Sequence, residues 1–245
     1  MARFMNVEGQ ASNAGNVPLS KEKLRALDPG VFKERTFKCD PYCPEDHPAE
    51  EMRVRFAEQL EFGDSRAALV MATSPLVVAA YSDELDAVVL LRFPPAFVSQ
   101  YRLEVGSRLV TVNSYRRWTG KKSGNLLYPP DMVVGPQQLN RYSSFLPLIA
   151  DFLTEDSARL EELKRNIDES EWARTRELGR QRIAVGLDTA RSGKPTESNF
   201  PYERAGMFLV GPDAPGAKSR MGLGRALLLF VLGVLLIVAG RMIRR

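Results

Sequence analysis

Three side chains that bind metals gather in one short, proline-rich segment of the chain. Cys39, Cys43 and His47 follow one another at intervals of four residues. Thiolates and imidazole suit zinc, and ligands this close in sequence can meet on a tight loop. A structural zinc site needs a fourth ligand, and because the sequence holds no other cysteine or histidine, Asp46, Glu50 or water would have to supply it. The segment defines a zinc-site hypothesis, and the alternative is a loop with two free thiols and an exposed histidine.

The same side chains can also be considered as a nucleophile and its base. Such a pair needs a group that orients the base and donors that stabilise the developing charge, and neither is evident beside His47. The sequence also lacks the Gly-x-Ser-x-Gly motif and the P-loop. The neighbouring acids Asp83, Glu84 and Asp86 are explained by a solvated turn between strands. We expect a protein that is not an enzyme, and a membrane-tethered enzyme that uses the Cys/His segment is the alternative.

A second cluster, in residues 115–125, interleaves cations with aromatic rings. Its central members are Arg116, Arg117, Trp118, Lys121 and Lys122. Such a patch can bind phosphates, stack on bases, or lie on anionic lipid headgroups with its tryptophan at the interface. The alternative is a solvated loop whose tryptophan folds onto the protein core.

The elements that must position these residues are strongest in residues 66–115. Three runs within this region are rich in Val, Leu and Ala with little polar alternation, a pattern typical of strands covered on both faces. Residues 108–115 alternate between apolar and polar side chains and predict a further strand. This region is therefore the expected β-rich core of an α+β domain that spans residues 20–185.

Helices are expected on both sides of this core in the sequence. Ser20 can cap a short helix over residues 21–27, and a second helix over residues 49–62 should end at Gly63. The expected C-terminal helical segments are residues 136–154, interrupted at Pro147, and a charged helix over residues 156–185.

One part of the β-rich region has a distinctive order of elements: a strand, a helical turn and a second strand. The residues of this pattern are Phe93, Pro94, Phe97, Tyr101, Leu103, Gly106, Leu109 and Val112. Residues 88–112 thereby resemble the swapped-hairpin element of AbrB-type transition regulators and antitoxins. The resemblance implies an intertwined dimer that binds DNA through basic loops. Because this chain has Ser107 where the family has an acidic residue, we expect the local shape alone and not the DNA binding.

The longest apolar run lies between Arg225 and Arg241, where 15 residues carry no charged or hydrogen-bonding side chain. A run that is apolar on all sides predicts a membrane-spanning helix. At about 1.5 Å per residue it is roughly 22 Å long, against a hydrocarbon core of about 30 Å. Snorkelling arginines, local bilayer thinning or helix pairing would make up the difference. The alternatives are a buried core helix or a surface-lying helix, although the polar face of a surface-lying helix is missing.

Small residues recur within this run at Ala226, Gly233 and Gly240. A spacing of seven residues places them on one side of a helix, where they allow two helices to approach closely. This stripe predicts a homodimer through the anchor, and the alternative is that glycine and alanine are simply common in such helices.

The positive net charge of the chain belongs to the anchor. From Lys218 onward there are six basic residues and no acidic ones, which leaves 28 basic against 30 acidic residues, a net charge of −2, in the rest of the chain. This balance disfavours nucleic acid as a partner. Since the N-terminal residues contain no apolar signal-peptide core, we expect a tail-anchored protein whose bulk lies in the cytosol.

The expected organisation has four parts. They are a loose tail (1–19), the cytosolic α+β domain (20–185), a Gly-, Pro- and Ser-rich linker (186–224) and the anchor (225–245). The expected partners are the lipid bilayer and a protein not identified by the sequence. No cofactor is expected, apart from the zinc of the hypothesis above. The sequence predicts a membrane-anchored binding or scaffolding module.

Overall fold

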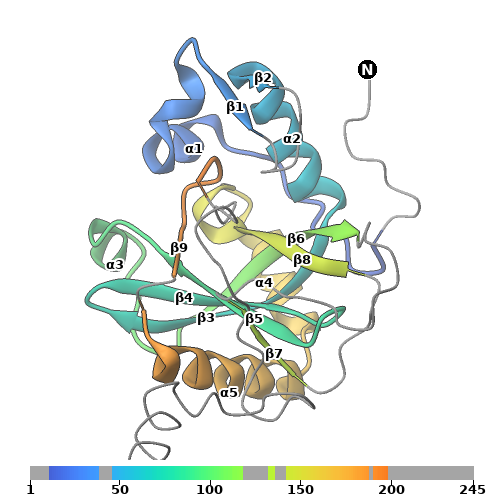
Figure 1. Cartoon of the computed structure of the whole chain (residues 1–245), viewed down its shortest axis with the longest axis vertical. Coiled ribbons are helices and arrows are strands. Elements are labelled where there is room, and N and C mark those ends of the chain that lie inside the picture. Colours follow the sequence, from blue (N-terminus) through green and yellow to red (C-terminus); the bar gives the residue numbers. More distant parts are fainter. Residues whose placement is uncertain (1–10, 39–45, 118–131, 136–141, 188–189, 198–245) are drawn as a thin grey trace, which may run out of the picture. The chain divides into compact units, whose positions relative to one another are not determined.

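A seven-stranded sheet forms the centre of the computed structural model, which describes residues 11–38, 46–117, 132–135, 142–187 and 190–197 (Figure 1). Six strands follow one another in the order β7-β5-β4-β3-β6-β8, and all their pairings are antiparallel. The seventh strand, β9, pairs in parallel with β5. The strands are β3 (Asp64–Thr73), β4 (Leu76–Ser82), β5 (Ala87–Arg92), β6 (Arg108–Arg117), β7 (Met132–Val134), β8 (Tyr142–Ile149) and β9 (Arg191–Ser192).

The centre of the sheet has Greek-key topology. Strands β3, β4 and β5 are consecutive antiparallel neighbours, and β6 then returns to lie beside β3. The connection from β5 to β6 carries the short helix α3 (Ala96–Gln100). The order of strand, helical turn and strand predicted for residues 88–112 is therefore present. However, β5 and β6 lie apart, separated by β4 and β3, and do not pair with each other as a hairpin.

Both faces of the central strands are covered, as their apolar runs predict. On β4, Val77 and Ala79 belong to the cluster beneath α5 (Glu169–Val185), whereas Val78 and Ala80 belong to the main core on the other face. Figure 1 shows α5 along one face of the sheet, with α1 and α2 on the opposite side. Because all seven residues of β4 are buried, no polar alternation is expected in its sequence.

The layer opposite α5 begins near the N-terminus of the described chain. It contains α1 (Lys21–Leu27), the 3-10 turn η1 (Pro29–Phe32), the small strands β1 (Thr36–Lys38) and β2 (Asp46–Pro48), and α2 (Ala49–Phe62). The predicted cap of the first helix is confirmed, since the Ser20 hydroxyl accepts a hydrogen bond from the Lys23 N–H at 3.3 Å. Gly63 ends α2, and its predicted apolar side (Met52, Phe56 and Leu60) is buried in the main core.

The charged helix expected over residues 156–185 is two helices. α4 (Ser157–Asn166) ends before Ile167 and Asp168, whose backbones are extended, and α5 follows. The reason lies in the apolar residues, because Leu160 and Leu163 of α4 pack in the main core while Trp172 packs on the other face of the sheet. One straight helix cannot reach both faces, so the chain turns at Ile167.

The helix expected over residues 136–154 is also wrong, because residues 142–149 form strand β8. Phe145 and Leu148 are buried in the main core, and their spacing of three is typical of one side of a helix, which is why the pattern was misleading. Pro147 lies opposite Asn113 on this outermost strand, where a residue without an N–H is tolerated. A 3-10 turn, η2 (Ala150–Phe152), follows the strand.

The first described residues are docked on the domain, although the sequence predicted a loose tail up to residue 19. Gly15 N–H donates to the Gly63 carbonyl at 3.1 Å, and Asn16 N–H donates to the Glu61 carbonyl at 2.9 Å. Ala14 forms an isolated antiparallel bridge with Asp64, and Val17 is buried in the main core. Small residues allow this close approach of backbone to backbone.

Part of the predicted linker likewise belongs to the domain. β9 extends the sheet beside β5, and the Arg191 guanidinium donates to the Phe145 carbonyl at 2.8 Å. The buried carboxylate of Asp28 accepts hydrogen bonds from the N–H of Thr196, at 3.0 Å, and from its hydroxyl. The domain therefore continues to residue 197, beyond the predicted boundary at residue 185.

The predicted anchor (225–245) and its small-residue stripe lie outside the described residues. Among the helices that the structure does describe, none combines the length and apolarity needed to cross a membrane. The anchor and the dimer through it therefore stay predictions.

Candidate functional site

Only one of the three predicted zinc ligands lies in the described part of the chain. His47 is buried in β2, and its Nδ1 lies 2.8 Å from Glu51 Oε1 and 3.4 Å from Arg55 Nη2. Cys39 and Cys43 lie outside the described residues, within which no group of three His, Cys, Asp or Glu side chains could hold a metal ion. The zinc site therefore stays a prediction.

The predicted anionic-ligand patch begins at the end of β6. The backbones of Arg116 and Arg117 pair with Ser144 and Tyr142 of β8. Their side chains, together with all of Trp118, Lys121 and Lys122, lie outside the described part of the structure. The anionic-ligand patch therefore stays a prediction.

Two of the three acids of the turn between β4 and β5, Asp83 and Asp86, are ion-paired, which the solvated turn predicted from the sequence did not include. Asp86 is buried and accepts two hydrogen bonds from Arg174 of α5, at 2.9 and 2.7 Å. Asp83 Oδ2 lies 2.5 Å from Arg66 Nη2 of β3. These acids join the turn to two other elements of the fold.

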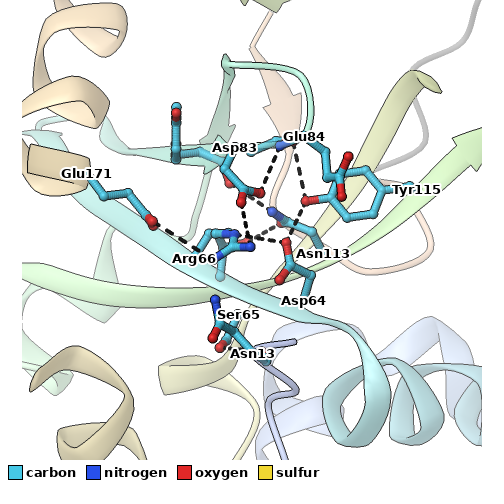
Figure 2. Close-up of polar contacts among 12 residues, drawn as sticks. Asn13, Asp64, Ser65, Arg66, Asp83, Glu84, Asn113, Tyr115 and Glu171 are labelled. Atoms are coloured by element: carbon cyan, nitrogen blue, oxygen red, sulfur yellow. Dashed lines mark hydrogen bonds and ion pairs between the residues drawn. The ribbon is translucent and has the colours of Figure 1, made fainter. Parts of the chain in front are cut away.

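Arg66 is the centre of a buried polar network (Figure 2). Its Nε donates to Asp64 Oδ2 at 2.9 Å, its Nη2 pairs with Asp83, and its Nη1 lies 4.0 Å from Glu171 Oε2. Asp64 Oδ2 also accepts a hydrogen bond from the Tyr115 hydroxyl at 2.7 Å. Three carboxylates from β3, the β4–β5 turn and α5 thus surround one guanidinium.

Charge and burial shift the pKa values of these groups. Burial raises the pKa of Asp64 from 3.8 to about 7, against the opposing effect of Arg66, and the charge of Asp83 raises it further. Burial also raises the pKa of Glu171, while its hydrogen bond from Ala67 and the charge of Arg66 lower it. Burial and the charge of Asp64 raise the pKa of the Tyr115 hydroxyl well above its usual value. Near pH 7, Asp64 is therefore poised between its protonated and ionised forms.

The network forms where one edge of β3 lacks a strand partner. β4 pairs with β3 only from Ala68 onward, so the preceding N–H groups on that edge need other acceptors. Ala67 N–H donates to Glu171 Oε1 at 2.7 Å, and Ser65 N–H donates to the Asn13 carbonyl at 2.8 Å. A carboxylate of α5 and the N-terminal segment thus take the place of a neighbouring strand.

A pocket of about 550 Å³ opens beside this edge, between residues 11–16, the start of β3 and the junction of α4 with α5. Arg66 and Glu171 of the network line it, together with Asn13, Asn166, Asp168 and Arg159. Arg159 also fixes the N-terminal segment, since its guanidinium donates to the carbonyls of Gly15 and Ala14 at 3.1 and 3.2 Å. The lining is mainly polar and holds two cations and two anions.

This arrangement is suited to recognition by hydrogen bonds. The Ser65 hydroxyl, which lines the pocket, donates to the Asn13 carbonyl at 2.6 Å rather than to a base. Asp64 has a pKa in the range of a general base, but it is not among the residues that line the pocket. The single histidine, His47, is also not among them. The described lining therefore offers hydrogen-bonding groups without a paired nucleophile and base.

This site is not predicted by the sequence, because its parts are far apart in the chain. Asn13, Arg66 and Glu171 come from three separate elements, and no local motif links them. The only sequence signal is that Asp64 and Arg66, two residues apart and so on one face, begin an otherwise apolar strand. Polar residues on a buried strand need partners, and the position of those partners follows from the tertiary fold alone.

We compared the chain with protein-family models, with curated proteins and with solved structures, and none of them matches it. The comparisons therefore add no support to the AbrB-type resemblance of residues 88–112.

Proposed function

We propose that this chain is a single-pass membrane protein whose α+β domain acts as a non-enzymatic binding module at the cytosolic face. Residues 225–241 provide the anchor in this proposal, and the polar pocket beside Arg66 provides the binding site. The observation that carries the binding role is the lining of this pocket, where polar and charged groups converge without a nucleophile–base pair among the described residues.

The anchor is supported by the 15 residues between Arg225 and Arg241 that lack any polar side chain. Eleven of these are strongly apolar, and each favours insertion by roughly 0.3–0.6 kcal/mol at the centre of a helix. The sum is on the order of 3–7 kcal/mol, enough for insertion if both arginines stay at the interface.

The binding role is supported by the size and position of the pocket. Pockets that bind small molecules commonly have volumes of roughly 300–1,000 Å³, and this pocket falls within that range at about 550 Å³. Its lining includes Arg66 and Glu171, whose positions are fixed by the buried network and by the backbone of β3. A site whose polar groups are held in place before a ligand arrives loses less entropy on binding.

The proposal is tested by recovering partners from native membranes with the full chain, once as wild type and once as Asn166→Trp. Asn166 is exposed and lines the pocket, so tryptophan should occupy the pocket while the Arg66–Asp64 pair keeps its own residues. We expect the recovery of the bound partner or ligand to fall by about tenfold or more, equivalent to a loss of at least 1.4 kcal/mol.

The matched control is Glu161→Trp, which introduces the same side chain at an exposed position of the same helix outside this pocket. Recovery should equal that of the wild type. If Asn166→Trp recovers the same molecules in the same amounts, the pocket is not the binding site.

A further inference from the structure

Two residues that line the pocket carry a guanidinium nitrogen and a carboxylate oxygen that lie too far apart to form a hydrogen bond with each other. Arg66 Nη1 and Glu171 Oε2 are separated by 4.0 Å, whereas an N–H···O hydrogen bond requires about 2.7–3.2 Å. The other atoms of both groups are engaged, since Asp64 and Asp83 hold Arg66 Nε and Nη2, and Ala67 N–H holds Glu171 Oε1. Nη1 and Oε2 thus remain as a donor and an acceptor, side by side in the pocket.

We propose that this pocket binds a polyhydroxylated, uncharged ligand of the sugar class, with one hydroxyl bridging Arg66 Nη1 and Glu171 Oε2. A hydroxyl oxygen accepts and donates at once, and a single oxygen can lie about 3 Å from both atoms when they are 4.0 Å apart. This inference rests on the proposed function, because it names the ligand of the same pocket.

The charge of the lining favours an uncharged ligand. The charged side chains that line the pocket are Arg66, Arg159, Asp168 and Glu171, two of each sign. Because Arg66 and Glu171 are adjacent, an anion or a cation bound between them would lie beside a like charge as well as an opposite one. A hydroxyl group has no such conflict, since it uses both charges for hydrogen bonds.

The remaining lining can serve further hydroxyl groups. Three asparagines and two serines share the pocket with the charged residues: Asn13, Asn16, Asn166, Ser12 and Ser65. An asparagine amide both donates and accepts, so it matches a hydroxyl in either direction. At about 550 Å³ the pocket can hold more than the one bridging group, which is why we infer several hydroxyls.

The test is saturation-transfer NMR on the full chain in nanodiscs, with D-glucose, D-galactose and D-mannose as probes. Acetamide, acetate and methylammonium are the comparison probes, because they represent a carboxamide, an anion and a cation. We expect transfer to at least one monosaccharide and weaker or no transfer to acetate and methylammonium. Transfer confined to the comparison probes would overturn the assignment to hydroxylated ligands, and so would absence of transfer to every probe.

Glu171→Gln tests the bridge itself. The glutamine carbonyl can still accept from Ala67 N–H, which leaves an amide donor at the position of Oε2, facing the donor of Arg66. Loss of a hydrogen bond to a charged group should raise the Kd of the bound monosaccharide on the order of tenfold to a hundredfold. The matched control is Glu177→Gln on the same helix, which is largely exposed, outside the pocket, and should leave the Kd unchanged.

A second variant keeps the result interpretable if Glu171→Gln is misfolded. Asn166→Trp fills the pocket from its exposed rim and should abolish transfer to the same monosaccharide. An unchanged Kd in both variants would contradict the inference. If acetate or methylammonium binds and its binding depends on Glu171, the pocket remains the binding site of the proposed function while the sugar class is wrong.

Discussion

At the scale of single residues, Asp64 connects the ionisation of the domain to its stability. It is buried beside Arg66, Asp83 and Tyr115, and burial together with Asp83 raises its pKa from 3.8 to about 7. A carboxyl group with a raised pKa in the folded state holds its proton there after the unfolded chain has lost it. Folding is then favoured below pH 3.8, and this contribution is lost as the pH rises toward 7.

Replacing Asp64 with asparagine should therefore remove one component of the pH dependence of unfolding. The asparagine side chain cannot titrate, but its oxygen can still accept from Arg66 Nε and the Tyr115 hydroxyl. Between about pH 4 and pH 7, the wild type should lose on the order of 3 kcal/mol of stability relative to Asp64→Asn. Glu171, whose pKa is also raised, titrates in both proteins and cancels in the difference.

The measurement is urea unfolding of both proteins at a series of pH values. The difference between their free energies of unfolding should change between about pH 4 and about pH 8 and be constant at higher pH. Parallel curves over the whole series would show that Asp64 has an ordinary pKa in the folded protein.

At the scale of elements, the docking of residues 11–17 completes the exposed edge of β3 and forms one wall of the pocket. Gly15 is the position of closest approach in this segment, because a Cβ there would lie 2.4 Å from the Leu60 carbonyl oxygen. This oxygen belongs to the backbone near the end of α2, so it cannot move aside without disturbing the helix. The pocket therefore depends on a glycine outside its own lining.

Gly15→Ala should displace the N-terminal segment. We expect a loss of about 1–3 kcal/mol in the free energy of unfolding, as for other overpacked sites, and faster hydrogen exchange of the Ser65 N–H, which donates to Asn13. The control is Ser12→Ala on the same segment, where the side chain is exposed and little change is expected. Unaltered exchange at Ser65 in Gly15→Ala would contradict the docking of this segment.

Sequence patterns correctly predicted the elements whose pattern of apolar residues can be read from neighbouring positions alone. The continuous runs of β3, β4 and β5 match strands buried on both faces, and Ser20 and Gly63 bound their helices as expected. The patterns failed where a residue's role depends on distant parts of the chain. Pro147 fits a strand only because β8 is outermost, and the helix break at Ile167 follows from the two faces that α4 and α5 cover.

The candidate site shows the same dependence on tertiary structure. Arg66, Glu171 and Asn13 are ordinary surface residue types in sequence, and only the sheet brings them to one edge of β3. The predicted zinc ligands and the anionic-ligand patch were conspicuous because their members are close together in sequence. A local cluster in the sequence does not identify the residues from distant parts of the chain that complete a buried site.

At the scale of the whole molecule, the central claim is that residues 225–241 hold the α+β domain at a membrane. In the proposed function, the domain supplies recognition through its pocket and the anchor supplies location. This proposal accounts for the distribution of net charge, since the six basic residues from Lys218 onward have no acidic neighbours while the rest of the chain carries a net charge of −2. Arginines at both ends of the run can lie at the interface while their stems cover apolar surface.

The most direct test is alkaline extraction of native membranes that contain the full chain or the double variant Leu229→Arg/Leu235→Arg. Each arginine near the centre of a spanning helix costs about 2.5–3.5 kcal/mol, so two of them should cancel the favourable insertion. We predict that the full chain stays in the membrane pellet and that the double variant moves to the soluble fraction, as should a chain lacking residues 222–245. Extraction of the wild-type chain, or retention of the double variant and the truncated chain in the pellet, would contradict the membrane-anchor account.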